Sequence, residues 1–277
     1  MSPVAAARPM PVALTVAGSD SGGGAGIQAD LKTFEALGVF GASALTCVTA
    51  QNPRGVAGIA PLTPDLVARQ IAAVREAFPV RAAKTGMLYS KAIILAVVRA
   101  FEGPAAPPLV VDPVMIAASG ARLLREDAIA ALRDRLLPRA AVLTPNVPEA
   151  ELLRGRPIRD AEDAFAAAME LRDRFGTSVL LKGGHLETGG RVRDWWAPRR
   201  GAPVVFEHRR RTNCETHGCG CTLSAALTAF LARGRSPGEA ARRAGDFVAA
   251  ALAAARPAGP HRPLNFAAAA ARLSRRA

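Results

Sequence analysis

The most constraining feature of this sequence is a regular alternation of short apolar runs with segments of helical periodicity. Apolar runs at 12–17, 42–48, 82–85, 109–111, 141–143 and 179–181 have the length of buried strands. Between them, apolar side chains recur every three or four residues, as at Ile27, Leu31 and Phe34. Strands and helices joined in turn by short connections predict a mostly parallel sheet covered by helices on both faces. The predicted fold class is therefore α/β.

Local signals support this order of elements. Thr63-Pro64-Asp65 combines a capping hydroxyl, a proline at the first helical position and an acid in the first turn, which predicts a helix start. Helices are expected at about 27–37, 64–78, 91–101, 126–137, 161–175, 221–233 and 237–255, and a β hairpin within 191–213. Neither an internal repeat nor a linker is evident. We therefore expect one domain over residues 1–277, frayed at residues 1–10 and at the extreme C-terminus.

The net charge of +13 raises the question of a nucleic-acid partner. Nucleic-acid binding favours a concentrated basic stripe with aromatic side chains, whereas these arginines are spread along helices and aromatic residues make up 5%. The spread of the arginines argues against a nucleic-acid partner. It favours a solvated basic surface, which suits small polyanions such as nucleotides. No apolar run is long enough to cross a membrane, and the N-terminus is not a convincing signal peptide. A cytoplasmic location with reduced thiols is expected.

Polar or glycine-rich motifs follow the predicted strands. They are GSDSGGGAG (18–26), TAQN (49–52), KTGM (84–87), DPVM (112–115), TPNVPE (144–149) and KGGH (182–185). In open parallel sheets, ligands bind beyond the carboxyl ends of the strands. The six motifs therefore predict one ligand site at that edge of the sheet.

The residue types in these motifs favour phosphate and a hard cation. Glycines in 18–26 let the backbone approach a ligand, although a tight turn alone would also explain them, and their spacing matches neither a dinucleotide fingerprint nor a Walker A loop. Asp112 and Glu149 are a carboxylate pair suited to Mg²⁺, although Glu149 could instead cap a helix. Lys182 could contact a phosphate or be an ordinary lysine at a strand end.

Three of the 4 cysteines lie in the stretch CETHGCGC (214–221). Its C-x-C spacing fits no common zinc module, and a Cys219–Cys221 disulfide would be strained. The glycines at a helix start instead predict backbone amides that bind an anion. Cys221 would lie in the first turn, where the pKa of a thiol is lowered and it can accept a proton. The alternative is a small cysteine that only packs the helix start.

Together, GSDSGGGAGIQADLKT, TAQN, KTGM, VVDPVM, TPNVPEA, LLKGGH and HGCGCTLSAAL resemble the hydroxymethylpyrimidine/phosphomethylpyrimidine kinases of thiamine biosynthesis, over Val12 to Gly234. The resemblance implies a ribokinase-like three-layer αβα sandwich with a small β hairpin or flap. It also implies ATP- and Mg²⁺-dependent phosphorylation of 4-amino-5-hydroxymethyl-2-methylpyrimidine to its monophosphate and then its pyrophosphate. Members of this superfamily often form dimers, so a homodimer is one option.

The same resemblance implies a role for each motif. The pyrimidine would contact Gln51, Met87, Gly18 and Asp30, ATP would contact Lys182 and Asn146, and Mg²⁺ would be served by Asp112 and Glu149. The anion hole would use the amides of Gly218, Cys219 and Gly220, and Cys221 would be the base. The family usually has threonine at the position of Cys219, and this departure puts the resting redox state and the rate in doubt.

Two other functions remain open from the sequence. A pyridoxal/pyridoxine kinase of the same branch would also phosphorylate a hydroxymethyl group on a small aromatic ring. A basic, non-catalytic nucleic-acid-binding protein would bind DNA or RNA in a salt-dependent way and consume no ATP.

Overall fold

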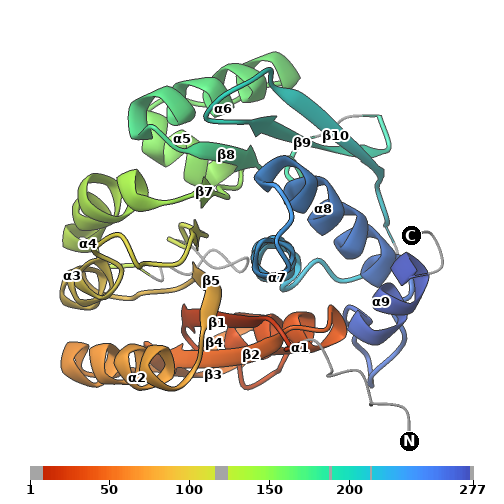
Figure 1. The fold of residues 1–277 in the computed structure, drawn as a ribbon. Coiled ribbons are helices and arrows are strands. Elements are labelled where there is room, and N and C mark those ends of the chain that lie inside the picture. Colours follow the sequence, from red (N-terminus) through yellow and green to blue (C-terminus); the bar gives the residue numbers. More distant parts are fainter. Residues whose placement is uncertain (1–8, 116–123, 187–188, 213, 275–277) are drawn as a thin grey trace, which may run out of the picture.

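A computed structural model gives the structure, which describes residues 9–115, 124–186, 189–212 and 214–274. Within these residues an eight-stranded sheet forms the centre of the molecule, in the order β10-β9-β8-β7-β6-β5-β1-β2 (Figure 1). The strands are β1 (Val12–Ala17), β2 (Phe40–Leu45), β5 (Val80–Thr85), β6 (Leu109–Val111), β7 (Val142–Leu143), β8 (Ser178–Leu181), β9 (Arg191–Ala197) and β10 (Val204–Arg209). Strands β1, β2 and β5–β8 are parallel, and β9 and β10 are antiparallel additions.

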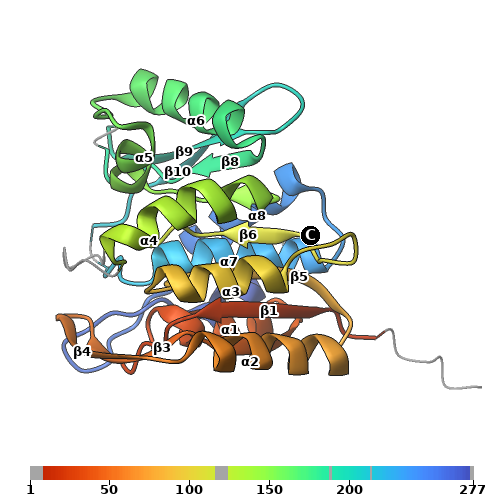
Figure 2. The same cartoon turned by 90° about the vertical axis from the view of Figure 1, so that its left-hand side faces the viewer.

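Helices cover both faces of the sheet (Figures 1 and 2). One face packs against α2 (Pro64–Ala77), α3 (Lys91–Ala100), α4 (Glu126–Ala131), α5 (Val147–Arg154) and α6 (Ala161–Phe175). The other packs against α1 (Gly26–Ala36), α7 (Cys219–Ala232), α8 (Pro237–Ala253) and α9 (Phe266–Ser274). Because side chains alternate along a strand, Leu14 and Val16 of β1 enter the first core and Ala13 enters the second. The predicted three-layer α/β fold is confirmed.

Several predicted boundaries follow from caps that the structure contains. Thr63 and Ser90 accept hydrogen bonds from Leu66 N and Ile93 N at the starts of α2 and α3, and Asp160 caps α6. Gly176 ends α6 in the left-handed conformation at φ 63°. The helix expected to reach residue 137 is α-helical only to Ala131. It continues as a π-helical segment (Leu132–Leu136) and a 3₁₀ turn (Leu137–Arg139) ahead of β7.

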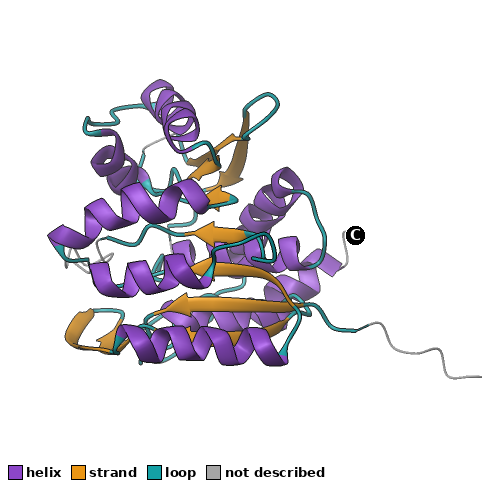
Figure 3. Cartoon of the chain, turned by 60° about the vertical axis from the view of Figure 1, so that its left-hand side comes forward, coloured by secondary structure: helices purple, strands orange, loops and turns teal. Residues whose placement is uncertain are grey.

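The bounds of one predicted strand are wrong. The run at 42–48 is divided at Thr46, whose hydroxyl donates to the carbonyl of Met87. Strand β2 ends before it, and β3 (Cys47–Asn52) leaves the main sheet to pair antiparallel with β4 (Gly55–Pro61). This ribbon lies beyond the carboxyl end of β1 (Figures 2 and 3). The TAQN motif is therefore inside a strand of the ribbon rather than after a strand of the sheet.

The sequence prediction also missed two helices, α5 and α9.

The hairpin expected in 191–213 is confirmed as β9–β10, and β9 pairs with β8, so the hairpin extends the main sheet. Trp195 and Trp196 in this hairpin are buried in the two opposite cores. The expected frayed ends fall largely on residues 1–8 and 275–277, outside the described residues. Among the described helices, none has the length and apolarity to span a membrane.

Candidate active site

The glycine loop that follows β1 is organised by the carboxylate of Asp20. This side chain is 1% exposed and accepts hydrogen bonds from the amides of Gly22 (2.9 Å), Gly24 (3.1 Å) and Ala25 (2.7 Å). Burial by itself would raise the pKa of Asp20, but hydrogen bonds from His217, Ala25 and Gly22 bring it below its ordinary value. The loop is therefore fixed around a buried negative charge.

Asp20 also joins this loop to the start of α7. The Nε2 atom of His217 lies 2.9 Å from Asp20 Oδ2. Gly218, the residue that precedes α7, has φ 80°, and a Cβ atom there would lie 1.8 Å from the carbonyl oxygen of Gly24. Only glycine fits this contact. Sequence reasoning did not assign a role to Asp20 or His217, although both lie in motifs that it singled out.

Helix α7 begins at Cys219, two residues earlier than expected. The predicted anion hole thus occupies the first turn, where helix amides have no intrahelical acceptor. The amide of Cys219 donates to the carbonyl of Thr216 at 3.1 Å, so one of the three predicted amides has a partner in this ligand-free structure. A Cβ on Gly220 would lie 3.3 Å from Lys182 Nζ, which places this turn beside a cation.

Cys221 is the third residue of α7, and the backbone amide of Gly26, the first residue of α1, acts to lower the pKa of its thiol. Burial raises the pKa of Cys221 to about 11, against an opposing effect of the Lys84 ammonium. The predicted lowering of this pKa is therefore wrong, because the loss of hydration on burial exceeds the lowering effects of Lys84 and the Gly26 amide. Burial likewise raises the pKa of Cys219 to about 12, and all 4 cysteines are free thiols.

The charged side chains of Asp112 and Lys182, which follow β6 and β8, lie beside the first turns of α7. Lys182 Nζ lies 2.7 Å from Asp112 Oδ1 and 3.9 Å from Glu149 Oε2. The hydroxyl of Ser224, one turn after Cys221, donates to the other carboxylate oxygen of Asp112 at 3.1 Å. The structure thus brings together the predicted phosphate cation, both predicted metal carboxylates and the predicted anion hole. Ser224 was missed; its place three residues after Cys221, one helical turn along, was the available signal.

Glu149 caps the start of α5 and also lies near the charges of Lys182 and Asp112. It forms a capping box with Asn146 at the start of α5: the Asn146 side chain accepts from Glu149 N, and Glu149 accepts from Asn146 N. The alternative helix-cap interpretation of Glu149 is confirmed. Burial raises its pKa to about 7, with Lys182 opposing and the Asp112 charge adding to the rise. The Asn146 side chain is engaged in this cap, and its contact with ATP stays a prediction.

The carboxylates of Asp112 and Glu149 fit a magnesium ion in chemistry and number. The described residues contain no group of three His, Cys, Asp or Glu side chains that could enclose a metal. Mg²⁺ at kinase sites is held by one or two carboxylates, with water and substrate phosphates completing its shell. Two carboxylates that meet a lysine and a glycine-rich helix start are an arrangement of this kind.

An apolar cluster lies on the other side of the glycine loop. Cys47 and Met87 are buried next to each other. The partly buried side chains of Val56, Ile59, Tyr89 and Val114 pack around them. A Cβ on Gly18 would lie 2.6 Å from the sulfur of Cys47 and 3.5 Å from that of Met87, so Gly18 permits this contact. Two of the predicted substrate residues, Gly18 and Met87, are thus neighbours.

The other two predicted substrate residues lie apart from this contact. Gln51 is in β3, and its backbone N–H and C=O are bonded to the Ser21 hydroxyl, which attaches the ribbon to the glycine loop. Asp30 is fully buried in α1 and accepts hydrogen bonds from Lys84 and Thr15. The structure thus shows Asp30 as the partner of a buried lysine, and its contact with the pyrimidine stays a prediction.

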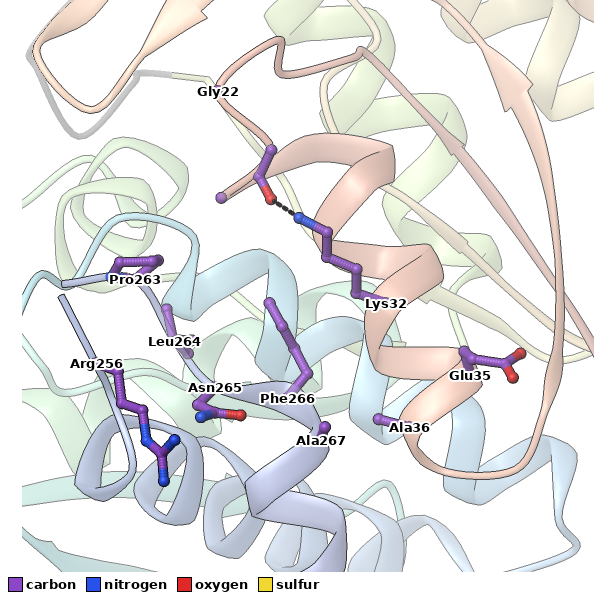
Figure 4. Close-up of a pocket in the computed structure, with 12 residues that line it drawn as sticks. Gly22, Lys32, Glu35, Ala36, Arg256, Pro263, Leu264, Asn265, Phe266 and Ala267 are labelled. Atoms are coloured by element: carbon purple, nitrogen blue, oxygen red, sulfur yellow. Dashed lines mark hydrogen bonds between the residues drawn. The ribbon is translucent and has the colours of Figure 1, made fainter. Parts of the chain in front are cut away.

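A cavity of about 550 Å³ lies behind the glycine loop, between α1 and the segment 263–267 (Figure 4). Its described lining contains none of the predicted site residues. Lys32 crosses one wall and donates to the carbonyl of Gly23 at 2.7 Å. Asp112, Glu149 and Lys182 are not among the residues that line this cavity.

Comparison with known proteins places this geometry in a family. The sequence pattern described as Phosphomethylpyrimidine kinase matches residues 20–265. The chain belongs to the phosphomethylpyrimidine kinase family. The resemblance seen in the sequence motifs is confirmed, and membership makes the protein a phosphotransferase.

Relatives agree over most of the chain. The hydroxymethylpyrimidine/phosphomethylpyrimidine kinase of Bacillus subtilis is 45% identical, with 87% of this chain and 88% of that protein covered. A thiamine biosynthesis bifunctional protein of Geobacter sulfurreducens is 46% identical over 91% of this chain, which spans about half (51%) of that longer protein.

Solved structures share the fold. Pyridoxal kinase of Bacillus subtilis in complex with ADP has a TM-score of 0.85 at 35% identity, covering 96% of this chain and 100% of that one. Pyridoxal kinase of Staphylococcus aureus in complex with AMP-PCP and pyridoxal has a TM-score of 0.83 at 33% identity, covering 94% and 95%. Phosphomethylpyrimidine kinase of Clostridium difficile has a TM-score of 0.74 at 40% identity, covering 86% and 97%.

Proposed function

We propose that this protein transfers a phosphoryl group from ATP to the hydroxymethyl group of 4-amino-5-hydroxymethyl-2-methylpyrimidine, and then a second one to the monophosphate. The observation that carries the proposal is the junction of Asp112, Lys182 and the glycine-rich first turn of α7. Phosphoryl transfer requires positioning and neutralisation of charge more than covalent chemistry by the protein. These groups supply both at one place.

The roles of the residues follow from their charges. Lys182 provides a fixed cation beside the helix amides of α7, where a transferring phosphoryl group carries its negative charge. Mg²⁺ held by Asp112 and Glu149 would neutralise phosphate oxygens. Ser224 fixes the orientation of the Asp112 carboxylate through their 3.1 Å hydrogen bond. Gly18 and Met87 present an apolar wall for the pyrimidine ring.

Cys221 is proposed to receive the proton of the attacking substrate hydroxyl. As this proton leaves, the hydroxyl oxygen forms its bond to the γ-phosphorus, and the bond from that phosphorus to ADP breaks. With a pKa of about 11 in the ligand-free protein, the thiol is protonated at neutral pH. The role therefore requires that bound substrates favour the thiolate. Cys221→Ala should lose most turnover while ATP affinity changes little, whereas undiminished turnover would remove the base role.

Product analysis tests the proposed function. Purified protein is incubated with ATP, Mg²⁺ and the hydroxymethylpyrimidine, and products are followed by mass; the monophosphate should form first and the pyrophosphate second. Asp112→Asn, prepared in the same way, controls for contaminating kinases. No phosphorylated pyrimidine, with ATP unspent, would contradict the proposal.

Pyridoxal kinase is the second candidate, because the neighbours with TM-scores of 0.83 and 0.85 are pyridoxal kinases at 33% and 35% identity. The pyrimidine is favoured because family relatives at 45% identity carry that activity in their names. Turnover of the two alcohols by one preparation separates the candidates. One kinase domain, a cytoplasmic location and a homodimer stay predictions.

A further inference from the structure

Lys84 and Asp30 form a buried ion pair that the proposed chemistry does not use. Both side chains are fully buried, and Lys84 Nζ lies 2.8 and 2.9 Å from the two carboxylate oxygens of Asp30. Thr15 donates its hydroxyl to the same carboxylate at 2.6 Å. A buried ion pair is weak evidence of stabilisation, because its desolvation offsets much of its attraction. Its position relative to the site is therefore informative.

The pair lies in the layer between the sheet and α7. Lys84 of β5 is directly opposite Thr15 of β1 in the parallel register. Side chains two residues earlier on these strands, Ala82 and Ala13, enter the core that includes α7. Because side chains alternate along strands, Lys84 and Thr15 point to that same face.

Helix α1 connects the pair to Cys221. The start of α1 meets the start of α7, since a Cβ on Gly218 would lie 3.4 Å from Ala25 Cα, and Asp30 lies on α1 four residues after Gly26, on the same face of the helix. The charged groups that act on this sulfur are Lys84, Asp30, Asp112 and Lys182. Among them, Lys84 opposes the effect of burial most strongly, and more strongly than Asp30 reinforces it. The ammonium is thus the end of the pair that favours the thiolate.

We infer that Lys84 is a positioning residue for phosphoryl transfer, which holds a positive charge beneath the Cys221 thiol and is itself held in place by Asp30. The inference deepens the proposed function, since it rests on Cys221 as the proton acceptor. A lysine at this place stabilises the thiolate during proton transfer without touching substrate. Asp30 keeps the ammonium in place through two hydrogen bonds from Lys84 Nζ.

Thiol reactivity tests this without substrate. The thiolate is the reactive form, so the alkylation rate of Cys221 by iodoacetamide at fixed pH reports the charge around it. Lys84→Met should slow alkylation at least five-fold, and Asp30→Asn should accelerate it at least three-fold. Lys84→Met/Asp30→Asn, which leaves no buried charge unpaired, should resemble Lys84→Met. Mass spectrometry of peptides measures each cysteine separately.

Two controls separate electrostatics from misfolding. The alkylation rate of Cys219 in the same samples should change less than two-fold, since the pKa of this thiol is raised by burial and by the neighbouring thiols Cys214 and Cys221. Thr15→Val, which removes one hydrogen bond to Asp30 and no charge, should leave the Cys221 rate within two-fold. Rates that shift in the same direction in Lys84→Met and Asp30→Asn, or do not shift, would overturn the inference.

Turnover links the charge to catalysis. Lys84→Met should lower kcat at least ten-fold with the KM for ATP within three-fold, and part of the loss should be recovered at higher pH. Unchanged kcat beside slowed alkylation would refute the role of Lys84 in the reaction. Absence of pyrimidine kinase activity in the unmodified protein would instead refute the proposed function and leave the alkylation result standing.

Discussion

The two halves of the candidate site differ in how they are held. On one side, the Lys182 ammonium attracts the buried carboxylates of Asp112 and Glu149, at 2.7 and 3.9 Å. On the other, Gly18, Cys47 and Met87 meet through sulfur and glycine contacts, beside a ribbon whose outer surface is partly exposed, as at Val48. Charge geometry tolerates little change, whereas apolar packing can be altered one side chain at a time. The first half suits a reaction shared by kinases, and the second suits a choice among alcohols.

The largest effect is expected from the charged half. Asp112→Asn should lower kcat about 100-fold or more on both the pyrimidine and pyridoxal, because it removes a carboxylate that positions Lys182 and would serve Mg²⁺. Steady-state kinetics on both alcohols measures this. Asp246→Asn, an ion-paired carboxylate on α8, is the control and should retain turnover. A large loss on one alcohol alone would break the proposed division between the halves.

The contact between the halves comes next. Gly218→Ala should lower kcat on both alcohols about 30-fold or more, because its Cβ would meet the Gly24 carbonyl and push the glycine loop away from α7. Gly234→Ala is a matched control: Gly234 also has φ 80°, but nothing lies within 4 Å of its Cβ position. Both variants share the strain of a positive φ. Equal losses of turnover in the two variants would assign the effect to strain rather than to the contact.

A smaller and selective effect is expected in the apolar half. Met87→Ala should change the ratio of kcat/KM between the pyrimidine and pyridoxal about ten-fold, with the KM for ATP nearly constant, since pocket apolar groups discriminate by ~1–3 kcal/mol. Met169→Ala removes a methionine packed in the core around α6 and should leave that ratio unchanged. A ratio unmoved by Met87→Ala would exclude this cluster from the pocket.

The layered fold could be predicted from the sequence because its strands and helices carry strong periodicity. The β3–β4 ribbon could not, since the turn at Thr46 depends on a hydrogen bond to Met87, 41 residues away. Helix α5 is short and begins directly after Thr144-Pro145-Asn146, so a possible cap at Glu149 was the only sign of it in the sequence. Structure that depends on long-range contacts, and helices of only a few residues, could therefore not be predicted from the sequence.

The strand-end charges could likewise be predicted, because parallel strands bring their carboxyl ends to one edge. The protonation of Cys221 could not, since burial depends on the packing of α1 and β5 against α7. Lys84 had a signal that was passed over. It is a lysine within the apolar strand VRAAKT, where a charge facing a core requires a buried partner.

The smallest predicted effect concerns the anchor that both halves share. The pKa of Asp20 in the folded protein is below its unfolded value of 3.8, so its contribution to stability is complete above that value and is lost as pH falls through the folded pKa. Asp20→Asn should therefore lower the thermal midpoint at pH 7 by several degrees and by less at pH 3, as measured by circular dichroism. Asp65→Asn, at an exposed helix position, should shift the midpoint little at either pH. A deficit for Asp20→Asn that persists in full at pH 3 would show that the shape of the loop, rather than the charge of Asp20, holds the two halves together.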